Sequence, residues 1–212
     1  MACHYIVMAD ILQSRSYEGE QLLAAFRRLV ASCNKDLSAG ILSPYTVTLG
    51  DEFQGVAGSL LWSMRTVLYL EEARLLGEAP FTLRYVVCLG EISTPLNPEA
   101  SYGMLGSGLA EARERLNDKR RGTSRFRVDL ADRELASQLR RLLEVMSSLC
   151  RDWKPADAGL ISDLLSNEDN AEVAAEHGKN RSQIWKRRRN LRVEDYKALR
   201  GILLELSAER TR

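Results

Sequence analysis

The chain has 212 residues, of which 45% are hydrophobic, and its formal net charge is +1. This length suits one large domain or a medium domain with a smaller one, and the hydrophobic content is enough for a buried core. The near-neutral charge excludes any argument for nucleic-acid binding from overall charge, so only local clusters of charge can support one.

Cysteine and histidine usage narrows the class of protein further. The four cysteines are scattered without a Cys-x-x-Cys pair, which indicates reduced thiols and a cytoplasmic location. Only two histidines are present, which argues against a His-rich zinc or iron site and leaves hard cations on carboxylates as the expected metals. Asp10 interrupts the first apolar run, so we expect neither a signal peptide nor a transmembrane helix, and no membrane partner.

The first predicted element is a buried strand. Residues 5–9 form a continuous apolar run, which predicts a central strand buried on both faces. Asp10 stands at its C-terminal end, where open sheets place ligand sites. An amphipathic helix follows, because apolar residues recur at three- and four-residue spacing from Leu22 to Cys33.

The segment 45–57 predicts a β-hairpin. Polar and apolar residues alternate along it, stop at Gly50, Asp51 and Glu52, and an apolar run then resumes. Gly-Asp is common at such tips simply because the turn needs φ > 0, so the pair alone leaves a structural and a functional interpretation open. A third acid, Asp10, at the end of another predicted strand favours the functional interpretation.

The next elements alternate in type: helix, strand, helix and strand are predicted at 60–75, 81–89, 109–116 and 125–130. Gly103, Gly106 and Gly108 precede the second of these helices. They can let backbone approach a ligand or simply loosen a turn, and we favour the turn because spaced glycines are a weak signal. The element order predicts an α+β sandwich in residues 1–131, with helices on one face of a mainly antiparallel sheet.

The C-terminal part has a different pattern without evident strands. Residues 132–212 are predicted to form a helical linker and a small all-α helix-turn-helix domain. A short helix at 170–178 ends in glycine, and a second helix spans 181–191. Ala174 is the small residue expected where these helices cross, and Ile184 is the expected core anchor of the second.

Basic residues crowd the second of these helices. A charge run is usually a solvated face, but no balancing acid occurs here before Glu194, which favours contact with double-stranded DNA. Early residues of such a helix meet base edges, and later basic residues hold phosphates. The predicted DNA-binding residues are Arg181, Ser182, Gln183, Lys186, Arg187, Arg188 and Arg189. A protein-docking helix centred on Trp185 is the competing interpretation.

Two carboxylates are candidates for metal binding. Asp10 and Asp51 end strands that can be neighbours, and with the carbonyl of Ile11 they form a candidate site for Mg²⁺ or Mn²⁺. Two such ions can activate a hydroxyl and stabilise a leaving pyrophosphate. Asp10 and Asp51 are therefore candidate catalytic residues. Basic side chains would neutralise phosphates, and the candidate nucleotide-binding residues are Ser14, Arg15, Gly50, Glu52, Arg113, Lys119, Arg120 and Arg121.

The hairpin tip at 49–53 resembles the Gly-Asp-bearing hairpin of class III nucleotide cyclases and GGDEF diguanylate cyclases. In those families too, the opening strand ends in an aspartate, as at Asp10. The segment 108–113 is similar to the cyclase helix that carries a transition-state Asn and Arg. The resemblance implies a ferredoxin-like, palm-type (nucleotide-cyclase-like) fold and a homodimer. Arg113 matches the Arg, so the resemblance makes it a third candidate catalytic residue. Leu109 stands where the Asn would be, so we expect weak or absent turnover.

The whole arrangement resembles the SatD family of bacterial proteins. Its most specific parts are Asp-Ile-x-x-Ser-Arg at 10–15 and Gly-Asp-Glu-Phe-Gln-Gly at 50–55, followed by the helix at 110–113 and a Trp before the helix-turn-helix. These features predict a DNA-binding regulator whose palm-like domain binds a nucleotide, a divalent metal or both. A magnesium- or manganese-dependent nucleotidyl transferase or cyclase-like enzyme acting on nucleoside triphosphates is the alternative. A C-terminal protein-interaction module is a third, weaker interpretation.

Overall fold

The computed structural model describes residues 2–14, 19–48, 50–76, 79, 81–120 and 122–208. Its strands are β1 (Ala2–Ile11), β2 (Ile41–Val47), β3 (Glu52–Ala57), β4 (Leu83–Ile92) and β5 (Phe126–Asp129). Its helices are α1 (Gly19–Asp36), α2 (Leu60–Leu75), α3 (Ser107–Asn117), α4 (Arg133–Leu149), α5 (Ala158–Ser166), α6 (Asn170–Glu176), α7 (Arg181–Asn190) and α8 (Val193–Ala208). Within the described ranges, no helix has the length and apolar character needed to cross a membrane.

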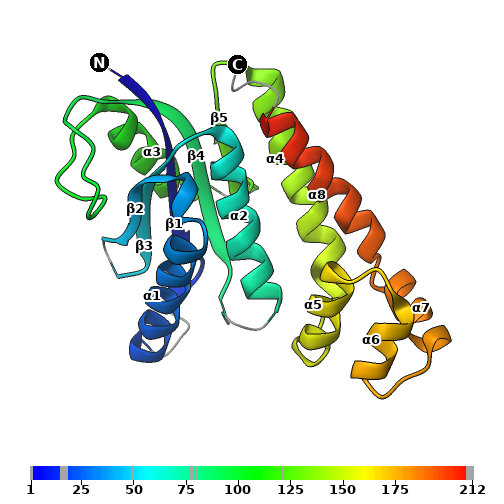
Figure 1. Cartoon of the computed structure of the whole chain (residues 1–212). Helices are drawn as coiled ribbons and strands as arrows, with labels where there is room; N and C mark the ends of the chain where they lie inside the picture. The colour runs from blue at the N-terminus through cyan, green and yellow to red at the C-terminus, as the bar shows by residue number, and fades with distance from the viewer. Residues whose placement is uncertain are drawn as a thin grey trace.

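The strands form one five-stranded sheet in the order β2-β3-β1-β4-β5 (Figure 1). β1 pairs antiparallel with β3 and β4, and β2 pairs antiparallel with β3. β5 is parallel to β4, so the chain crosses over between them through α3. The mixed α+β class is confirmed, and β1 to β4 with α1 and α2 have the β-α-β-β-α-β element order of the ferredoxin-like motif.

Helices cover both faces of the sheet, so the predicted arrangement with helices on one face is wrong. Val7 and Ala9 of β1 belong to the core that includes residues of α1 and α2. Ile6 and Met8 belong to a second core with residues of α3. Successive side chains of a strand point to opposite faces, and β1 is apolar at both sets of positions. The predicted burial of β1 on both faces is confirmed, and α3 covers the face that carries Ile6 and Met8.

The helix α3 lies close to β4 because glycines occupy the crossing. A Cβ added to Gly108 would lie 2.6 Å from backbone atoms of Gly90 and Glu91. Backbone cannot move aside as a flexible side chain can, so Gly90 and Gly108 serve close packing of helix on strand rather than the favoured turn. Gly103 does occupy a left-handed conformation, with φ +74°, as a turn glycine would.

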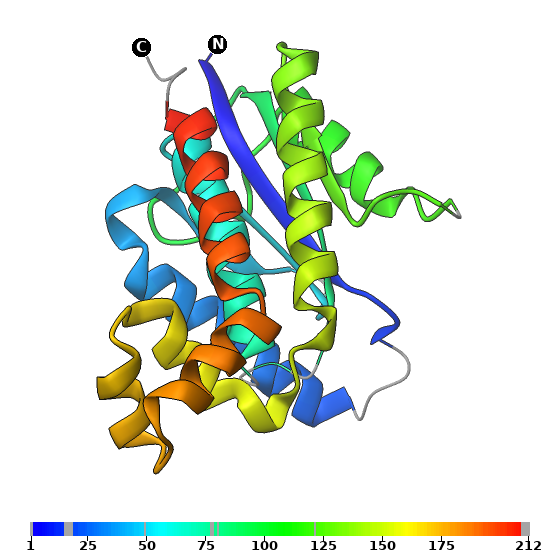
Figure 2. The same ribbon diagram turned by 90° about the vertical axis from the view of Figure 1, so that its right-hand side faces the viewer.

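The C-terminal helices continue the first core. α8 packs against α2 and α4, and α4 packs against β5. Figures 1 and 2 both show α4 and α8 side by side, with α5, α6 and α7 gathered at one end of this pair. Trp153 fixes that end, because its Nε1 donates to the carbonyl of Leu191 at 2.9 Å and its ring lies 5.1 Å from that of Tyr196. A division of the chain at residue 131 stays a prediction.

Candidate functional site

Asp10 is buried at the end of β1 and faces an arginine on the neighbouring strand. It lies opposite Arg84 in the antiparallel register of β1 and β4, and opposite Glu52 in that of β1 and β3. Arg84 donates from Nε to Oδ1 and from Nη2 to Oδ2 of Asp10, both at 3.1 Å. Both residues are buried, and such a bidentate guanidinium–carboxylate contact is among the strongest hydrogen-bonded pairs in proteins.

Two further charges act on the Asp10 carboxylate. Burial raises the pKa of Asp10, and the positive charges of Arg84 and Lys119 oppose that rise. The Nζ of Lys119 lies 3.9 Å from Oδ2 of Asp10. The negative charge of Asp51 contributes to the rise in pKa.

The side chains around Asp10 do not fit a divalent cation. Mg²⁺ and Mn²⁺ need oxygen ligands, but both carboxylate oxygens of Asp10 accept hydrogen bonds from Arg84. Lys119 adds a second positive charge beside them. In the part of the chain that the structure describes, no group of three or more His, Cys, Asp or Glu side chains could hold a metal ion. Asp10, one of the three predicted metal ligands with Asp51 and Ile11, is thus already paired with Arg84.

The tip of the β2–β3 hairpin is tied to the end of β1. Gly50 has φ +83°, the left-handed conformation that glycine adopts without strain. The N–H of Ile11 donates to the carbonyl of Asp51 at 2.9 Å. Glu52 is buried, and its Oε1 accepts a hydrogen bond from Arg113 at 2.9 Å. Gly50 therefore adopts the positive φ that the predicted turn needs, and Glu52 forms an ion pair with Arg113.

Arg113 lies in a different cavity from Lys119 and Arg120. It also donates to Oε1 of Gln54 at 3.1 Å. It lines a cavity of about 390 Å³ with Gln54, Leu109 and residues 102–106, among others. Lys119 does not line this cavity. The structure therefore separates Arg113 from Lys119 and Arg120 but pairs it with Glu52, another predicted nucleotide-binding residue.

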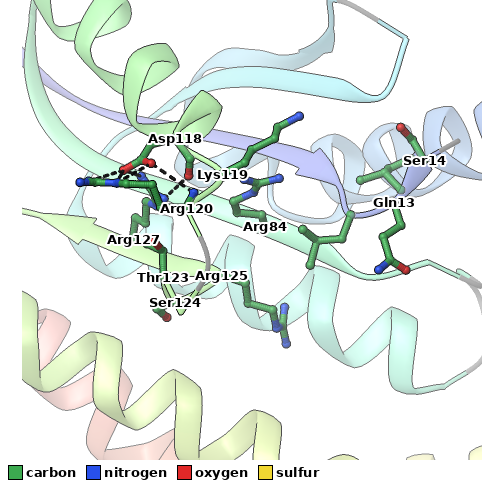
Figure 3. Close-up of a pocket in the computed structure, with 12 residues that line it drawn as sticks. Gln13, Ser14, Arg84, Asp118, Lys119, Arg120, Thr123, Ser124, Arg125 and Arg127 are labelled. Carbon is green, nitrogen blue, oxygen red and sulfur yellow. Dashed lines mark hydrogen bonds and ion pairs between the residues drawn. The ribbon is translucent and has the colours of Figure 1, made fainter.

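A larger cavity, of about 820 Å³, opens where β1 ends and β4 begins. We call it the basic pocket, and its lining consists of Ile11, Leu12, Gln13, Ser14, Arg84, Asp118, Lys119, Arg120, Thr123, Ser124, Arg125 and Arg127. Figure 3 shows Arg84 and Lys119 near its middle, between Ser14 on one side and Arg120 on the other. It thus brings together three predicted nucleotide-binding residues: Ser14, Lys119 and Arg120.

Hydrogen bonds hold the wall of the pocket that follows α3. Arg120 pairs with Asp118 at 2.6 Å, and this hydrogen bond lowers the pKa of Asp118 to about 2. Arg127 donates to the backbone carbonyls of Arg115 and Asp118, which lie at the C-terminal end of α3. Helix ends leave such carbonyls without intrahelical partners, so Arg127 stabilises the end of α3 while lining the pocket.

Three basic residues of the pocket were not predicted: Arg84, Arg125 and Arg127. A signal existed for Arg84, because it shares a strand face with the next apolar inward positions of β4, and a buried charge needs a partner. Arg125 lies just before the four-residue strand β5 and Arg127 lies within it, and neither gave such a signal. The predicted residues Arg15 and Arg121 lie outside the described residues.

The helices α6 and α7 are joined by a defined turn. Ala174 and Ile184 are buried, as predicted. Gly178 has φ +58°, and Asn180 begins α7 with a capping box. In this box the side chain of Asn180 accepts the N–H of Gln183, and the side chain of Gln183 accepts the N–H of Asn180.

The predicted DNA-binding residues of α7 fall into two groups. The exposed ones are Arg181, Ser182, Gln183, Lys186 and Arg189. Arg187 is half-buried and pairs with Asp157 at 2.5 Å. Arg188 is buried and donates to Asn170, to Glu194 and to the carbonyls of Leu164 and Asn167. The prediction that Arg188 contacts DNA is therefore corrected: its guanidinium joins α7 to the segments around it.

Comparisons with known proteins give a family but little more. One similar solved structure is described as "Structure of a bacterial light-regulated adenylyl cyclase", with a TM-score of 0.44 and 15% sequence identity. That match covers 60% of this chain and 75% of the other. No curated protein matches. A sequence model of the SatD family matches residues 4–190, and the chain therefore belongs to the SatD family.

Proposed function

We propose that this chain is a regulator that holds the phosphates of a nucleotide in the basic pocket. The lining carries the proposal, because five of its twelve residues are basic and one is acidic. Its volume of about 820 Å³ lies in the range typical of small-molecule sites. Clustered arginine and lysine side chains are the groups that neutralise phosphates in proteins.

Polar groups beside the charges support the same ligand class. The hydroxyls of Ser14, Thr123 and Ser124 line the pocket and can donate to phosphate oxygens. Gln13 has φ +56°, an uncommon conformation for a residue other than glycine. Such backbone outliers concentrate at ligand sites, where surrounding structure holds them.

Binding of nucleoside triphosphates tests the proposal directly. We expect ATP, GTP, CTP or UTP to raise the melting temperature of the protein, because a ligand of the native state stabilises it. Lys119→Ala should weaken binding about tenfold, the effect of losing one charge-assisted hydrogen bond. Lys119 is mostly exposed, so this change should leave the fold intact. Lys35→Ala, at an exposed position in the last turn of α1, is the charge-matched control.

The proposal is overturned if no triphosphate at millimolar concentration shifts the melting temperature. It is also overturned if Lys119→Ala binds as tightly as Lys35→Ala. Size-exclusion chromatography of the same samples measures whether the binding species is the homodimer that the cyclase resemblance implies.

A specific observation favours DNA as a second ligand, bound through α7. The capping box gives this helix a fixed N-terminus, and Arg181, Ser182 and Gln183 are exposed there. Lys186 and Arg189 are exposed further along the same helix, which contains no acidic residue. Exposed early residues followed by basic ones match the order in which a recognition helix meets bases and phosphates.

The double change Lys186→Ala, Arg189→Ala tests this contact. It should weaken binding to every duplex and lower the salt slope by about two units, one for each phosphate contact. Fluorescence anisotropy of labelled genomic fragments at low and high salt measures both quantities. Arg27→Ala, Arg28→Ala removes the same charge from the exposed side of α1 and should bind as the unchanged chain does. Binding that is absent at micromolar protein, or equal in both variants, would leave α7 as a protein-docking helix.

A further inference from the structure

We propose that Arg84 occupies the role of a divalent cation at Asp10, so that the basic pocket binds phosphates without a metal. The inference rests on the proposed function and names how its site works. Its basis is the pair itself: Arg84 bonds both oxygens of Asp10 at 3.1 Å, and each residue is buried.

A carboxylate beside a phosphate site has to be neutralised. Asp10 is negative, and burial strengthens its repulsion of any anion that enters next to it. A metal ion would remove that repulsion by taking the carboxylate as a ligand. Arg84 removes it instead, because a guanidinium stays charged at all physiological pH values and its planar fork matches a carboxylate.

The guanidinium of Arg84 can serve both partners. Its bonds to Asp10 use Nε and Nη2. Within the described ranges its other Nη group has no hydrogen-bond partner, and Arg84 lines the basic pocket. Lys119, with its Nζ 3.9 Å from Asp10, extends the same positive region into the pocket. One buried cation thus faces the carboxylate on one side and the cavity on the other.

Manganese alone, titrated without any nucleotide, gives the first test. In the unchanged protein, isothermal titration calorimetry and the Mn²⁺ paramagnetic resonance signal should detect no saturable Mn²⁺ site that depends on Asp10. Arg84→Ala should create such a site, because it frees both oxygens of the buried Asp10 carboxylate and leaves only the mostly exposed Lys119 as a cation beside them. The double change Arg84→Ala, Asp10→Asn should remove the site again. Arg84→Lys keeps a positive charge and should not bind Mn²⁺.

The unchanged protein decides the question even if Arg84→Ala does not fold. A saturable Mn²⁺ site in it that Asp10→Asn abolishes would overturn the inference. Asp10→Asn can be checked for folding by circular dichroism, and Asp51→Asn serves as the matched change at the neighbouring carboxylate.

The second test uses nucleoside triphosphates in EDTA and in Mg²⁺. The inference expects saturable binding in EDTA, with Lys119→Ala weakened in both buffers. Binding that appears only with Mg²⁺ would overturn the inference and leave the proposed nucleotide function standing. If no triphosphate binds in either buffer, the proposed function fails and the Mn²⁺ titration still decides what neutralises Asp10.

Discussion

Glu71 of α2 is a carboxylate whose hydrogen-bond partners come from distant parts of the chain. It is buried, accepts a hydrogen bond from Tyr85 at 2.9 Å, and pairs bidentately with Arg125. Burial raises its pKa, but the hydrogen bonds and charge of Arg125, with smaller contributions from Arg74 and Tyr85, outweigh burial and leave the pKa lowered. Glu71 is therefore ionised in the folded protein at neutral pH.

Replacing the buried Glu71 with Gln should lower stability by roughly 3 kcal/mol at neutral pH, because the half-buried Arg125 loses its counter-charge. A carboxyl group whose pKa is lower in the folded state contributes stability above its unfolded pKa and loses it as pH falls through the folded pKa. The difference in melting temperature between the unchanged chain and Glu71→Gln should therefore shrink as the pH falls from 7 to below 4. Glu114→Gln, at an exposed position of α3, should show no comparable difference at any pH.

Contacts between residues far apart in the chain are the part of the site that sequence could not predict. Asp10 was found because it ends a visibly apolar strand. Its partner Arg84 lies 74 residues away, and Arg125 lies 54 residues from Glu71. The cross-strand register and the β5 crossover create these pairs, and no local pattern records a register. These two ion pairs therefore exist only in the folded chain and leave no trace in the local sequence.

At the scale of elements, α3 is the helix that connects the sheet to the basic pocket. Its start lies on β4 at Gly108 and Gly90, and the segment after its end carries Asp118, Lys119 and Arg120. Periodicity predicted the strands and helices of this region, but not the face on which α3 lies. The apolar run of β1 implied a second covered face, yet amphipathic pattern alone does not say which helix covers it.

Gly108→Ala should lower the free energy of unfolding by roughly 1–3 kcal/mol, the usual cost of overpacking. The added Cβ would lie 2.6 Å from the backbone of β4, so α3 has to move away from the sheet. That movement should also weaken triphosphate binding, because Lys119 follows α3. Gly201→Ala, in α8 with nothing within 4 Å of its Cβ, should instead keep or raise stability. Melting curves and triphosphate titrations of both variants would show whether close packing at Gly108 is required, and equal behaviour would contradict it.

At the scale of the whole molecule, the C-terminal helices return to the α+β unit. Tyr196 of α8 donates to Glu72 of α2 at 3.1 Å across 124 residues of sequence, and Arg200 pairs with the same carboxylate. The sequence predicted that strands end before residue 132 and that helices follow. It did not predict that α4 and α8 share a core with α2. An apolar stripe shows that one face of a helix is buried, but not which element packs against that face.

The cross-strand pairing of Asp10 and Arg84 also constrains how this site can change over generations. Losing Asp10 leaves the buried Arg84 without its counter-charge, and losing Arg84 leaves buried Asp10 with only the mostly exposed Lys119 beside it. Breaking a buried ion pair in this way costs roughly 3–5 kcal/mol. That is a large fraction of the stability of an average domain. Lineages should therefore keep both residues or replace both, and an isolated loss of Arg84 would survive most readily where cellular magnesium can occupy the orphaned carboxylate. If phosphates bind here without a metal, as we propose, a single substitution would then give a site that requires one.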